Sequence, residues 1–434
     1  STGSTGPLSI TMNCTIFSHL PSAQPRFCQM EFVHSIVPNH IHGCFLDVRN
    51  ASPRPYANAK IIIPSERTKS MMNSRHYEAC SDDTAVHLLP PVLSSSEVFA
   101  RLGKNRESFG GKEEFLAMYS SIVGGITTDP GAMVIPIDDH MVHRGHGVFD
   151  TAAIFDGYLY ELDQHLDRIL RSATKAKITL PFGRETIRNI LIETVKVSKC
   201  KNGSLRYWLS VGPGDFKLSP KNCRVPALYA IVIQNQCPLT FKGVKVVTST
   251  VPIKPPEFAT VKSVNYLPNA LSVMEAEEKD AFAAIWLDEY GFIAEGPNMN
   301  VAFVSHEMEL LMPRFDKILS GCTAKRALAL AEELVKNGKL RGINLTNVGV
   351  EEGKSAKEMM LMGSGVLVRP VVQWDDTIIG DGITNTVTAF HFASFLVEFF
   401  PCRDRRSDCG SVVEDDNGRH EIRTIAYPHT NQLT

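Results

Sequence analysis

Residues 152–162 read AAIFDGYLYEL, two arms of alternating apolar residues on either side of the dipeptide Asp156-Gly157. Asp-Gly tolerates the positive φ angles of a tight turn, so this stretch predicts a β-hairpin. Residues 164–178, QHLDRILRSATKAKI, change to the apolar spacing of a helix. The residues at that spacing are Leu166, Ile169, Leu170 and Ala173. A hairpin followed by an amphipathic helix is typical of an α+β fold.

The same two patterns continue on both sides of QNQCP at 234–238, which we interpret as a linker. Before it, strands are predicted at 206–211 and 227–233; after it, a second hairpin is predicted at 282–296 and a helix at 319–335. We therefore expect two α+β domains with an appendage at each end. The predicted parts are an N-terminal extension at 1–95, a smaller domain at 96–236, a larger domain at 237–400 and a polar, flexible tail at 401–434.

The composition is that of an ordinary globular chain with small ligands. Of its 434 residues, 43% are hydrophobic and 21% are charged, and the formal net charge is -2. The sequence has no long run of lysine and arginine, so nucleic acid is not an expected partner. The 10 cysteines form no CxxC pair and no zinc-binding spacing, which predicts free thiols and no metal site. The apolar run at 388–400, TAFHFASFLVEFF, is short for a membrane span and predicts a buried or amphipathic helix.

The two ends of the chain differ from its middle. Residues 1–30 contain no acidic residue and are rich in Ser and Thr, as organellar transit sequences are; a disordered leader is the alternative. Residues 31–95 contain loop signals and predict no fold, and the tail at 401–434 lacks a hydrophobic period.

Lys262 stands in apolar, β-branched sequence, within ATVKSVNYLPNAL at 259–271. Partial desolvation lowers the pKa of a lysine, so that its neutral amine can form a Schiff base with a carbonyl. Pyridoxal phosphate, the commonest partner of such a lysine, needs an acid at its pyridine nitrogen, and Glu295 at a predicted strand end is the candidate. Its phosphate needs backbone N–H groups, for which SGCT at 320–323 and GSGV at 363–366 are candidates.

Each of these residues also has an ordinary explanation. Lys262 could be an exposed solubility residue, Glu295 could end a hairpin, and SGCT could be a plain helix cap. Arg168 lies about 200° from Leu166 on an ideal helix, off the apolar stripe, so amphipathicity alone predicts a surface charge. Residue spacing alone leaves the function open.

Six segments spread over about 300 residues carry a more specific signal when taken together. They are HRGHGVFDT, ELDQHLDRILRSA, KSVNYLPN, DEYGFIAEGPNMNVAF, LSGCTAKR and MGSGVLVRPV. In this order they resemble the class IV, fold-type IV pyridoxal-phosphate enzymes, which include branched-chain transaminases, D-amino-acid transaminases and aminodeoxychorismate lyases. Within that family the chain is most similar to the plant, plastid-targeted D-amino-acid transaminases, so we expect a plastid location and otherwise a cytoplasmic one.

The resemblance implies a smaller α+β domain and a larger domain with a barrel-like sheet. Pyridoxal 5′-phosphate would lie between them, usually in a homodimer. It implies that Lys262 forms the Schiff base and transfers protons, that Glu295 pairs with the pyridine nitrogen, and that Tyr266 lies near the phenolic oxygen. It assigns the phosphate to Arg168, the backbone of Cys322 and Thr323, and Ser364. The expected reaction is ping-pong transamination from D-alanine or D-aspartate to 2-oxoglutarate or pyruvate.

Substrate binding departs from the family pattern. Bacterial D-specific relatives carry an arginine just before the glycine of a strand-end loop, where this chain has Val211. Arg144 and Arg206 are the nearest cationic candidates for the carboxylate, although Arg206 could instead pair with an acid inside the sheet. Phe149 is a further substrate-binding candidate.

The residue at position 151 raises an alternative activity. Thr151 matches the threonine that assists elimination in aminodeoxychorismate lyases, although threonine is also a common strand residue. Lyase activity, branched-chain L-amino-acid transamination and a non-catalytic pyridoxal-phosphate-binding role are the alternatives.

Overall fold

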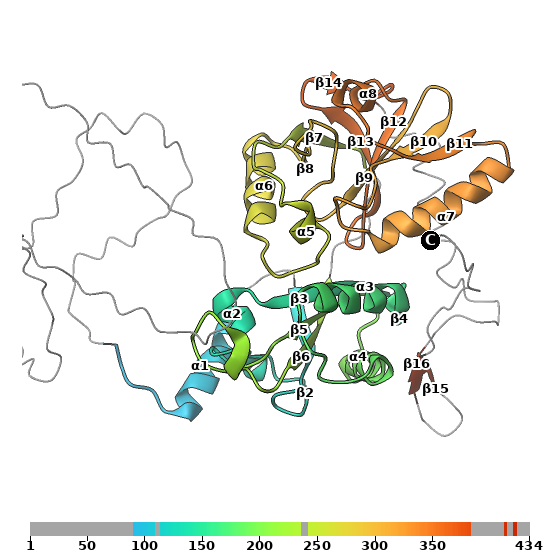
Figure 1. Ribbon diagram of the computed structural model, residues 1–434. Helices are drawn as coiled ribbons and strands as arrows, with labels where there is room; N and C mark the ends of the chain where they lie inside the picture. Colours follow the sequence, from blue (N-terminus) through green and yellow to red (C-terminus); the bar gives the residue numbers. More distant parts are fainter. Residues whose placement is uncertain (1–89, 109–112, 236–241, 383–411, 415–419, 423–434) are drawn as a thin grey trace, which may run out of the picture. The chain divides into compact units, whose positions relative to one another are not determined.

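The protein is represented by a computed structural model that describes residues 90–108, 113–235 and 242–382, together with two short strands near the C-terminal end (Figure 1). The described residues all belong to one compact unit. Within the described residues the chain forms one large sheet before residues 236–241, and a second large sheet and a two-stranded sheet after them.

Six of the described strands form the first sheet, which is antiparallel throughout, in the order β2-β1-β6-β5-β3-β4. Its strands are β1 (Glu113–Ser120), β2 (Gly125–Thr127), β3 (Gly147–Phe155), β4 (Tyr158–Leu159), β5 (Gly203–Ser210) and β6 (Ala227–Asn235). Phe155 pairs with Tyr158, which leaves Asp156 and Gly157 as the turn, both at positive φ. The predicted hairpin is therefore confirmed.

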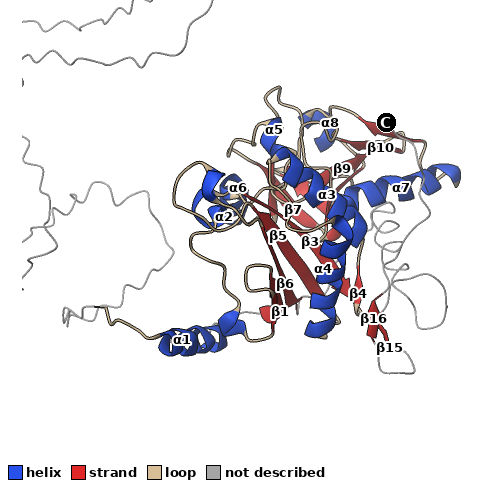
Figure 2. Ribbon diagram, turned by 60° about the horizontal axis from the view of Figure 1, so that its bottom comes forward, coloured by secondary structure: helices blue, strands red, loops and turns tan. Residues whose placement is uncertain are grey.

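Helices α3 (Leu162–Lys175) and α4 (Arg184–Ser198) cover one face of this sheet (Figure 2). Three residues of the predicted stripe of α3, Leu166, Ile169 and Ala173, are buried in one core with residues of β3, β5 and β6, and Leu170 packs against this core partly buried. A buried apolar stripe of this kind is what holds an amphipathic helix on a sheet.

Eight further described strands form a mixed sheet, in the order β11-β10-β9-β12-β13-β7-β8, with β14 paired to β13. They are β7 (Val244–Thr248), β8 (Ala283–Ile285), β9 (Asn300–Val304), β10 (Glu309–Met312), β11 (Gly342–Leu345), β12 (Glu358–Gly363), β13 (Leu367–Trp374) and β14 (Thr377–Ile378). Strand β7 runs parallel to both neighbours, β13 and β8. The end strands β11 and β8 are not paired with each other in the described residues, so the barrel-like sheet is an open half barrel.

The helices of the second half are α5 (Pro256–Ala259), α6 (Leu267–Glu278), α7 (Cys322–Lys336) and α8 (Val350–Lys354). Helix α7 packs on β11 and β12. It does so through the stripe that its sequence predicts, since Ala327, Leu330, Ala331 and Leu334 are all buried. The remaining described helices are α1 (Ser95–Ser108), α2 (His140–Arg144) and the 3-10 turns η3 (Pro130–Ala132) and η4 (Pro220–Asn222).

The structure bears on the ends of the chain only in part. The predicted leader at 1–30 and the predicted helix at 388–400 lie outside the described residues. In the tail, however, β15 (Val412–Glu414) and β16 (His420–Ile422) form an antiparallel pair, where the sequence predicts no order. Valine and isoleucine favour strands, and Asn417-Gly418 between the two segments is a preferred hairpin dipeptide. We propose that each large sheet, with its helices, is one domain and that the boundary lies at Gln236.

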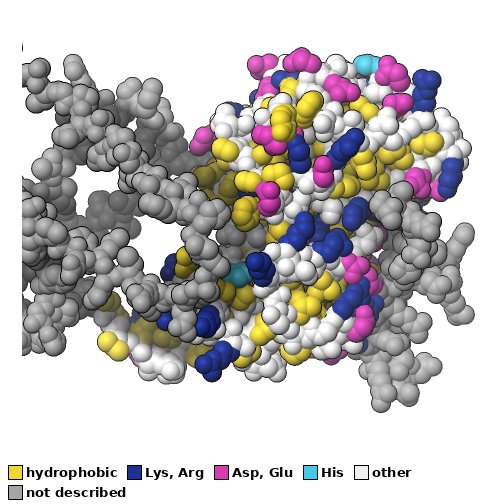
Figure 3. All heavy atoms as spheres, in the orientation of Figure 1, with side chains coloured by type: hydrophobic (Ala, Val, Ile, Leu, Met, Phe, Trp, Pro, Cys, Tyr) yellow, Lys and Arg dark blue, Asp and Glu magenta, His cyan; other side chains and the backbone are white. Residues whose placement is uncertain are grey.

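The surface and the thiols agree with the composition. On the face that Figure 3 shows, basic, acidic and apolar side chains are interspersed. Cys200, Cys223 and Cys322 are free thiols, and the other cysteines lie outside the described residues. None of the helices in the described part of the chain is long and apolar enough for a membrane crossing.

Candidate active site

Lys262 belongs to the second half of the chain, but its segment is bonded to the first sheet. Phe149 N–H donates to the Lys262 carbonyl at 2.9 Å, and Lys262 N–H donates to Ser172 Oγ at 3.2 Å. The side chain of Lys262 is buried, with 9% of the residue exposed. These bonds fix the backbone of the lysine where the two sheets meet, so its amine has a defined position.

The turn after α2 supports the same segment. Gly145 ends this helix at φ 67, in the left-handed region that favours glycine, and Asn265 Nδ2 donates to its carbonyl at 3.1 Å. A Cβ at this position would also collide with Asn265 Oδ1. Gly145 therefore allows the loop after Lys262 to pack against the turn that follows α2.

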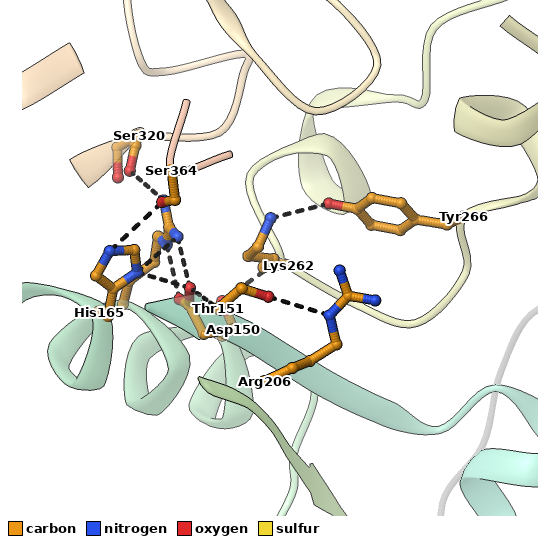
Figure 4. Close-up of polar contacts among 10 residues, drawn as sticks. Asp150, Thr151, His165, Arg206, Lys262, Tyr266, Ser320 and Ser364 are labelled. Atoms are coloured by element: carbon orange, nitrogen blue, oxygen red, sulfur yellow. Dashed lines mark hydrogen bonds and ion pairs between the residues drawn. The ribbon is translucent and has the colours of Figure 1, made fainter. Parts of the chain in front are cut away.

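The amine of Lys262 lies against two aromatic rings. Lys262 Nζ donates to Tyr266 Oη at 3.2 Å and lies 4.8 Å from the centroid of the Phe149 ring. The two rings meet edge to face with centroids 5.0 Å apart. In Figure 4, Tyr266 and Arg206 lie on one side of Lys262, and His165, Ser320 and Ser364 lie on the other.

The N-terminus of α7 provides unpaired donors on that other side. The cap residue Gly321 has no side chain that could accept from the first N–H groups, and Cys322 and Thr323 at the helix start are buried. Thr323 Oγ1 is buried without a hydrogen-bond partner in the described residues. A Cβ on Gly321 would collide with Asn300 Oδ1. Free N–H groups at a helix start, the positive end of the helix dipole and a free hydroxyl favour a bound anion.

Arg168 adds a positive charge next to this helix start. Its guanidinium binds Asp150 with both Nε and Nη2, at 2.8 and 2.6 Å, and Nη1 donates to the Ser320 carbonyl at 3.5 Å. Arg168 is 5% exposed, so the surface position that the helical wheel alone predicts is wrong. The wheel fails because α3 has two buried sides, one on the first sheet and one facing Ser320.

His165 connects the ion pair to the second sheet. Its Nδ1 lies 2.8 Å from Asp150 Oδ1, and its Nε2 lies 3.5 Å from Ser364 Oγ, in the turn between β12 and β13. Burial opposes the charge of His165, but the nearby Cys322 and Asp150 raise its pKa to about 9. Burial would raise the pKa of Asp150, yet Arg168 and His165 hold it well below its usual range. The Arg168 guanidinium and the His165 imidazole thus share the one carboxylate of Asp150.

Glu295 is the buried acid of the site, with 8% of the residue exposed. It lies at the end of the predicted second hairpin, in which Trp286 N–H donates to the Glu295 carbonyl. Burial raises the pKa of Glu295 to about 8, although the charges of Lys254 and Lys262 oppose the rise. Such a carboxyl is ready to bind a cationic N–H group.

A cavity of about 360 Å³ brings these residues together, a size suited to a small molecule. The sequence-predicted residues that line it are Phe149, Thr151, Arg168, Arg206, Lys262, Tyr266, Glu295, Cys322, Thr323 and Ser364. Arg144 does not line it, because Arg144 is exposed on α2 and donates to the Phe216 carbonyl at 2.7 Å. Arg206 is also exposed, and its Nε donates to Thr151 Oγ1 at 3.3 Å. The alternative pairing of Arg206 with an acid inside the sheet is therefore wrong.

The lining fits pyridoxal phosphate in three respects. It offers an amine for the aldehyde at Lys262, a buried acid for the pyridine nitrogen at Glu295, and a cationic pocket with an unpartnered hydroxyl for the phosphate. In the part of the chain that the structure describes, no three His, Cys, Asp or Glu side chains are grouped to hold a metal ion.

Sequence reasoning missed Asp150, His165 and Lys254. Asp150 is a charged residue at an inward position of a strand, and His165 stands three positions before Arg168 on the same helix. Both patterns are visible in the sequence, but neither indicates the partner. Lys254, in VPIKPPEF, also lines the cavity and was not distinguishable from any other loop lysine.

Residues 147–374 match the family model of the class IV amino-transferases. The chain belongs to this family, and it is an aminotransferase. It is 66% identical over 304 residues to the chloroplastic D-amino-acid transaminase of Arabidopsis thaliana, covering 70% of this chain and 80% of that protein. It is 27% identical over 256 residues to the D-alanine aminotransferase of Bacillus licheniformis, covering 58% of this chain and 88% of that protein.

The fold is also that of solved aminotransferases. The branched-chain amino acid aminotransferase from Escherichia coli matches with a TM-score of 0.59 at 19% identity, over 66% of this chain and 95% of that one. The expected α+β, fold-type IV class is therefore confirmed.

Proposed function

We propose that the protein is a pyridoxal-phosphate-dependent transaminase that transfers the amino group of a D-amino acid to a 2-oxo acid. The observation that carries this proposal is the cavity that joins the Lys262 amine to a buried acid and to a cationic helix start. The similarity to the D-amino-acid transaminase of Arabidopsis thaliana supports the D preference, with D-alanine or D-aspartate as donor and 2-oxoglutarate or pyruvate as acceptor.

Three groups of residues hold the cofactor in this proposal. Arg168, Ser364, Thr323 Oγ1 and the N–H groups at the start of α7 bind the phosphate. Glu295 pairs with the pyridine nitrogen and Tyr266 lies at the phenolic oxygen. The bound cofactor supplies an aldehyde for the amino group and a protonated ring that accepts the electrons left at the substrate Cα.

Lys262 performs the proton transfer. Its Nζ removes the proton from the substrate Cα and later returns one, as general base and then general acid. The hydrogen bond to Tyr266 Oη and the Phe149 ring hold Nζ within the cavity. Glu295 holds a proton at the pyridine nitrogen, because its buried carboxylate is stabilised by a cationic N–H partner.

The location and assembly belong to the same proposal. Residues 1–30 have the composition of a transit sequence, and the Arabidopsis thaliana relative is described as chloroplastic, so we place the protein in the plastid. We also propose a homodimer, as the family resemblance implies.

The test is the rate of transamination with matched donors. D-Alanine, D-aspartate, L-leucine and L-valine are offered with 2-oxoglutarate, and the 2-oxo acid produced is measured. Transfer should be fastest from a D-amino acid, with parallel double-reciprocal lines that indicate ping-pong kinetics. Faster processing of L-leucine and L-valine than of any D-amino acid would replace this proposal by branched-chain transamination.

A second activity has one specific observation in its favour. Because Arg206 Nε donates to Thr151 Oγ1, the hydroxyl proton of Thr151 remains available to a ligand in the cavity. A proton donor at this wall suits elimination of a leaving group, as in aminodeoxychorismate lyases. We propose lyase activity as a weak side reaction of the same site.

A further inference from the structure

Lys254 is a second lysine in the cavity. It lies in the loop between β7 and α5 and lines the same cavity wall as Tyr266. Its Nζ is 4.6 Å from the centroid of the Tyr266 ring, and Lys262 Nζ is 5.6 Å from the same centroid. The two ammonium groups therefore approach one aromatic ring.

The backbone of Lys254 is held in place. Pro255 and Pro256 follow it directly, and Pro256 is the first residue of α5. A residue before proline is restricted to extended conformations. The backbone of Lys254 is therefore restricted, although the residue lies in a loop.

The ammonium of Lys254 has no acid partner within 4 Å among the described residues, although the residue is half-buried. Lys317 shows the usual arrangement: its Nζ lies 4.4 Å from the Tyr290 centroid but is also paired with Asp288 at 3.1 Å. Burial lowers the pKa of Lys254. The positive charge of Lys262 lowers this pKa further, whereas the negative charge of Glu295 raises it. A partly buried cation with only a ring contact is left with bonding capacity for an anion.

Arg206 occupies the opposite end of the aromatic pair. Its Cζ is 6.0 Å from the Phe149 centroid, and it is exposed, whereas Lys254 is half-buried beside Tyr266. Every amino acid and 2-oxo acid carries a carboxylate on the carbon that reacts at Lys262, so the receptor for that group must be close to Lys262. An exposed arginine suits the far end of a substrate better.

We propose that Lys254 Nζ binds the α-carboxylate of the amino-acid and 2-oxo-acid substrates. This inference rests on the proposed function and deepens it. Lys254 takes the role for which the sequence suggests Arg144 or Arg206. Arg206 is then available for the side-chain carboxylate of a dicarboxylic substrate such as D-aspartate.

The experiment compares Lys254→Met and Lys254→Arg with the control Lys317→Met, which removes a lysine from a tyrosine ring outside the cavity. All are prepared as holoenzymes, with folding checked by thermal unfolding. Calorimetry measures the Kd of propionate, an unreactive carboxylate. Kinetics measure kcat/KM for D-alanine and for D-alaninol, which has no carboxylate.

Lys254→Met should weaken propionate binding and raise the KM for D-alanine about 10- to 100-fold, the range of a lost charge-assisted hydrogen bond. D-Alaninol should react at the wild-type rate, and Lys254→Arg should retain most of the propionate affinity. Unchanged propionate binding in Lys254→Met, or an equal loss with D-alanine and D-alaninol, would overturn the assignment. Since propionate is achiral, its binding tests Lys254 even where the D preference of the proposed function fails.

Discussion

Glu295 illustrates how one residue would link the stability of the protein to binding of the proposed cofactor. Without a cationic partner its carboxyl is buried, so the folded protein retains the proton to about pH 8, compared with 4.5 for an ordinary glutamate. The acid that the proposed chemistry needs is therefore unfavourable as a free carboxylate in the folded chain. A pyridine N–H group removes this cost.

This gives a pH prediction for the cofactor-free protein. The pKa of Glu295 is higher in the folded protein than in the unfolded chain. Its contribution to stability is therefore fully present below pH 4.5 and is lost as the pH rises through about 8. The free energy of unfolding of wild type should therefore fall relative to Glu295→Gln between these values, by up to about 1.4 kcal/mol per pH unit. Urea unfolding at pH 5, 6.5 and 8 measures the difference; parallel curves would contradict the prediction. The holoenzyme of Glu295→Gln should fold but lose most transamination.

Lys262 is predicted to be the only residue that borohydride links to the cofactor. Lys262→Ala should lose the reducible link while retaining some non-covalent cofactor, because the phosphate pocket is made by other residues. Borohydride treatment followed by peptide mapping checks this in wild type and variant. A label on Lys254, which lines the same cavity, would refute the assignment. Peptide mapping distinguishes the two lysines, whereas the number of labels per chain does not.

Thr151 is predicted to act in elimination and not in amino transfer. Thr151→Val keeps the shape of the side chain but removes the proton donor, so lyase activity should fall at least about tenfold more than transamination. Release of pyruvate and 4-aminobenzoate from aminodeoxychorismate is followed in both proteins. Equal loss of the two activities would mean that Thr151 only shapes the cavity, and no release from wild type would remove the lyase proposal.

Among the helices and strands, α3 positions two charged residues of the site. One side of this helix packs on the first sheet, and the other presents His165 and Arg168 to the start of α7. Two ion pairs on α3 differ sharply in burial. Asp150 and Arg168 are 0% and 7% exposed at their side chains, whereas Asp163 and Arg184 are 39% and 34% exposed.

We predict that Asp150→Asn destabilises the protein by about 3–5 kcal/mol, because it leaves a buried guanidinium without its carboxylate. It should also weaken cofactor binding, since Arg168 loses the partner that orients it. The matched variant Asp163→Asn should cost about 1 kcal/mol or less, because Asp163 and its two partners, Arg184 and Arg188, are all partly exposed to solvent. Urea unfolding and cofactor titration of the two variants provide the comparison. Equal effects would show that burial does not decide the strength of these pairs.

At the scale of the molecule, the proposed phosphate pocket takes its residues from both sheets and their helices. Arg168 and His165 come from the first sheet region, while Ser320, Ser364 and the start of α7 come from the second. An anion bound there contacts both halves. Its binding should therefore stabilise the whole unit and not one sheet.

Inorganic phosphate should raise the Tm of the cofactor-free protein by mass action, and chloride at equal ionic strength should not. Arg168→Met should abolish the phosphate effect. Differential scanning calorimetry at several phosphate concentrations measures the shift. The same rise with chloride would point to general salt effects and against an anion site.

Local pattern was sufficient for several elements of this protein. The hairpin around Asp156-Gly157 and the buried stripes of α3 and α7 follow from periodicity over a few residues, and the structure confirms them. A side-chain period is a property of neighbouring residues, so the chain needs no distant contact to express it. The family resemblance also selected ten residues that line one cavity.

The positions that local pattern could not reveal depend on contacts between distant segments. Arg168 is buried because α3 meets the start of α7, and a helical wheel contains only one helix. Arg144 lies outside the cavity because the carbonyl of Phe216 takes its donors. Lys254 becomes a candidate for substrate binding only because Tyr266 and Glu295, which belong to other segments, line the same cavity. The burial of a side chain and its charged partners depend on which distant segments are in contact. Those contacts form only when the sheets and helices pack together.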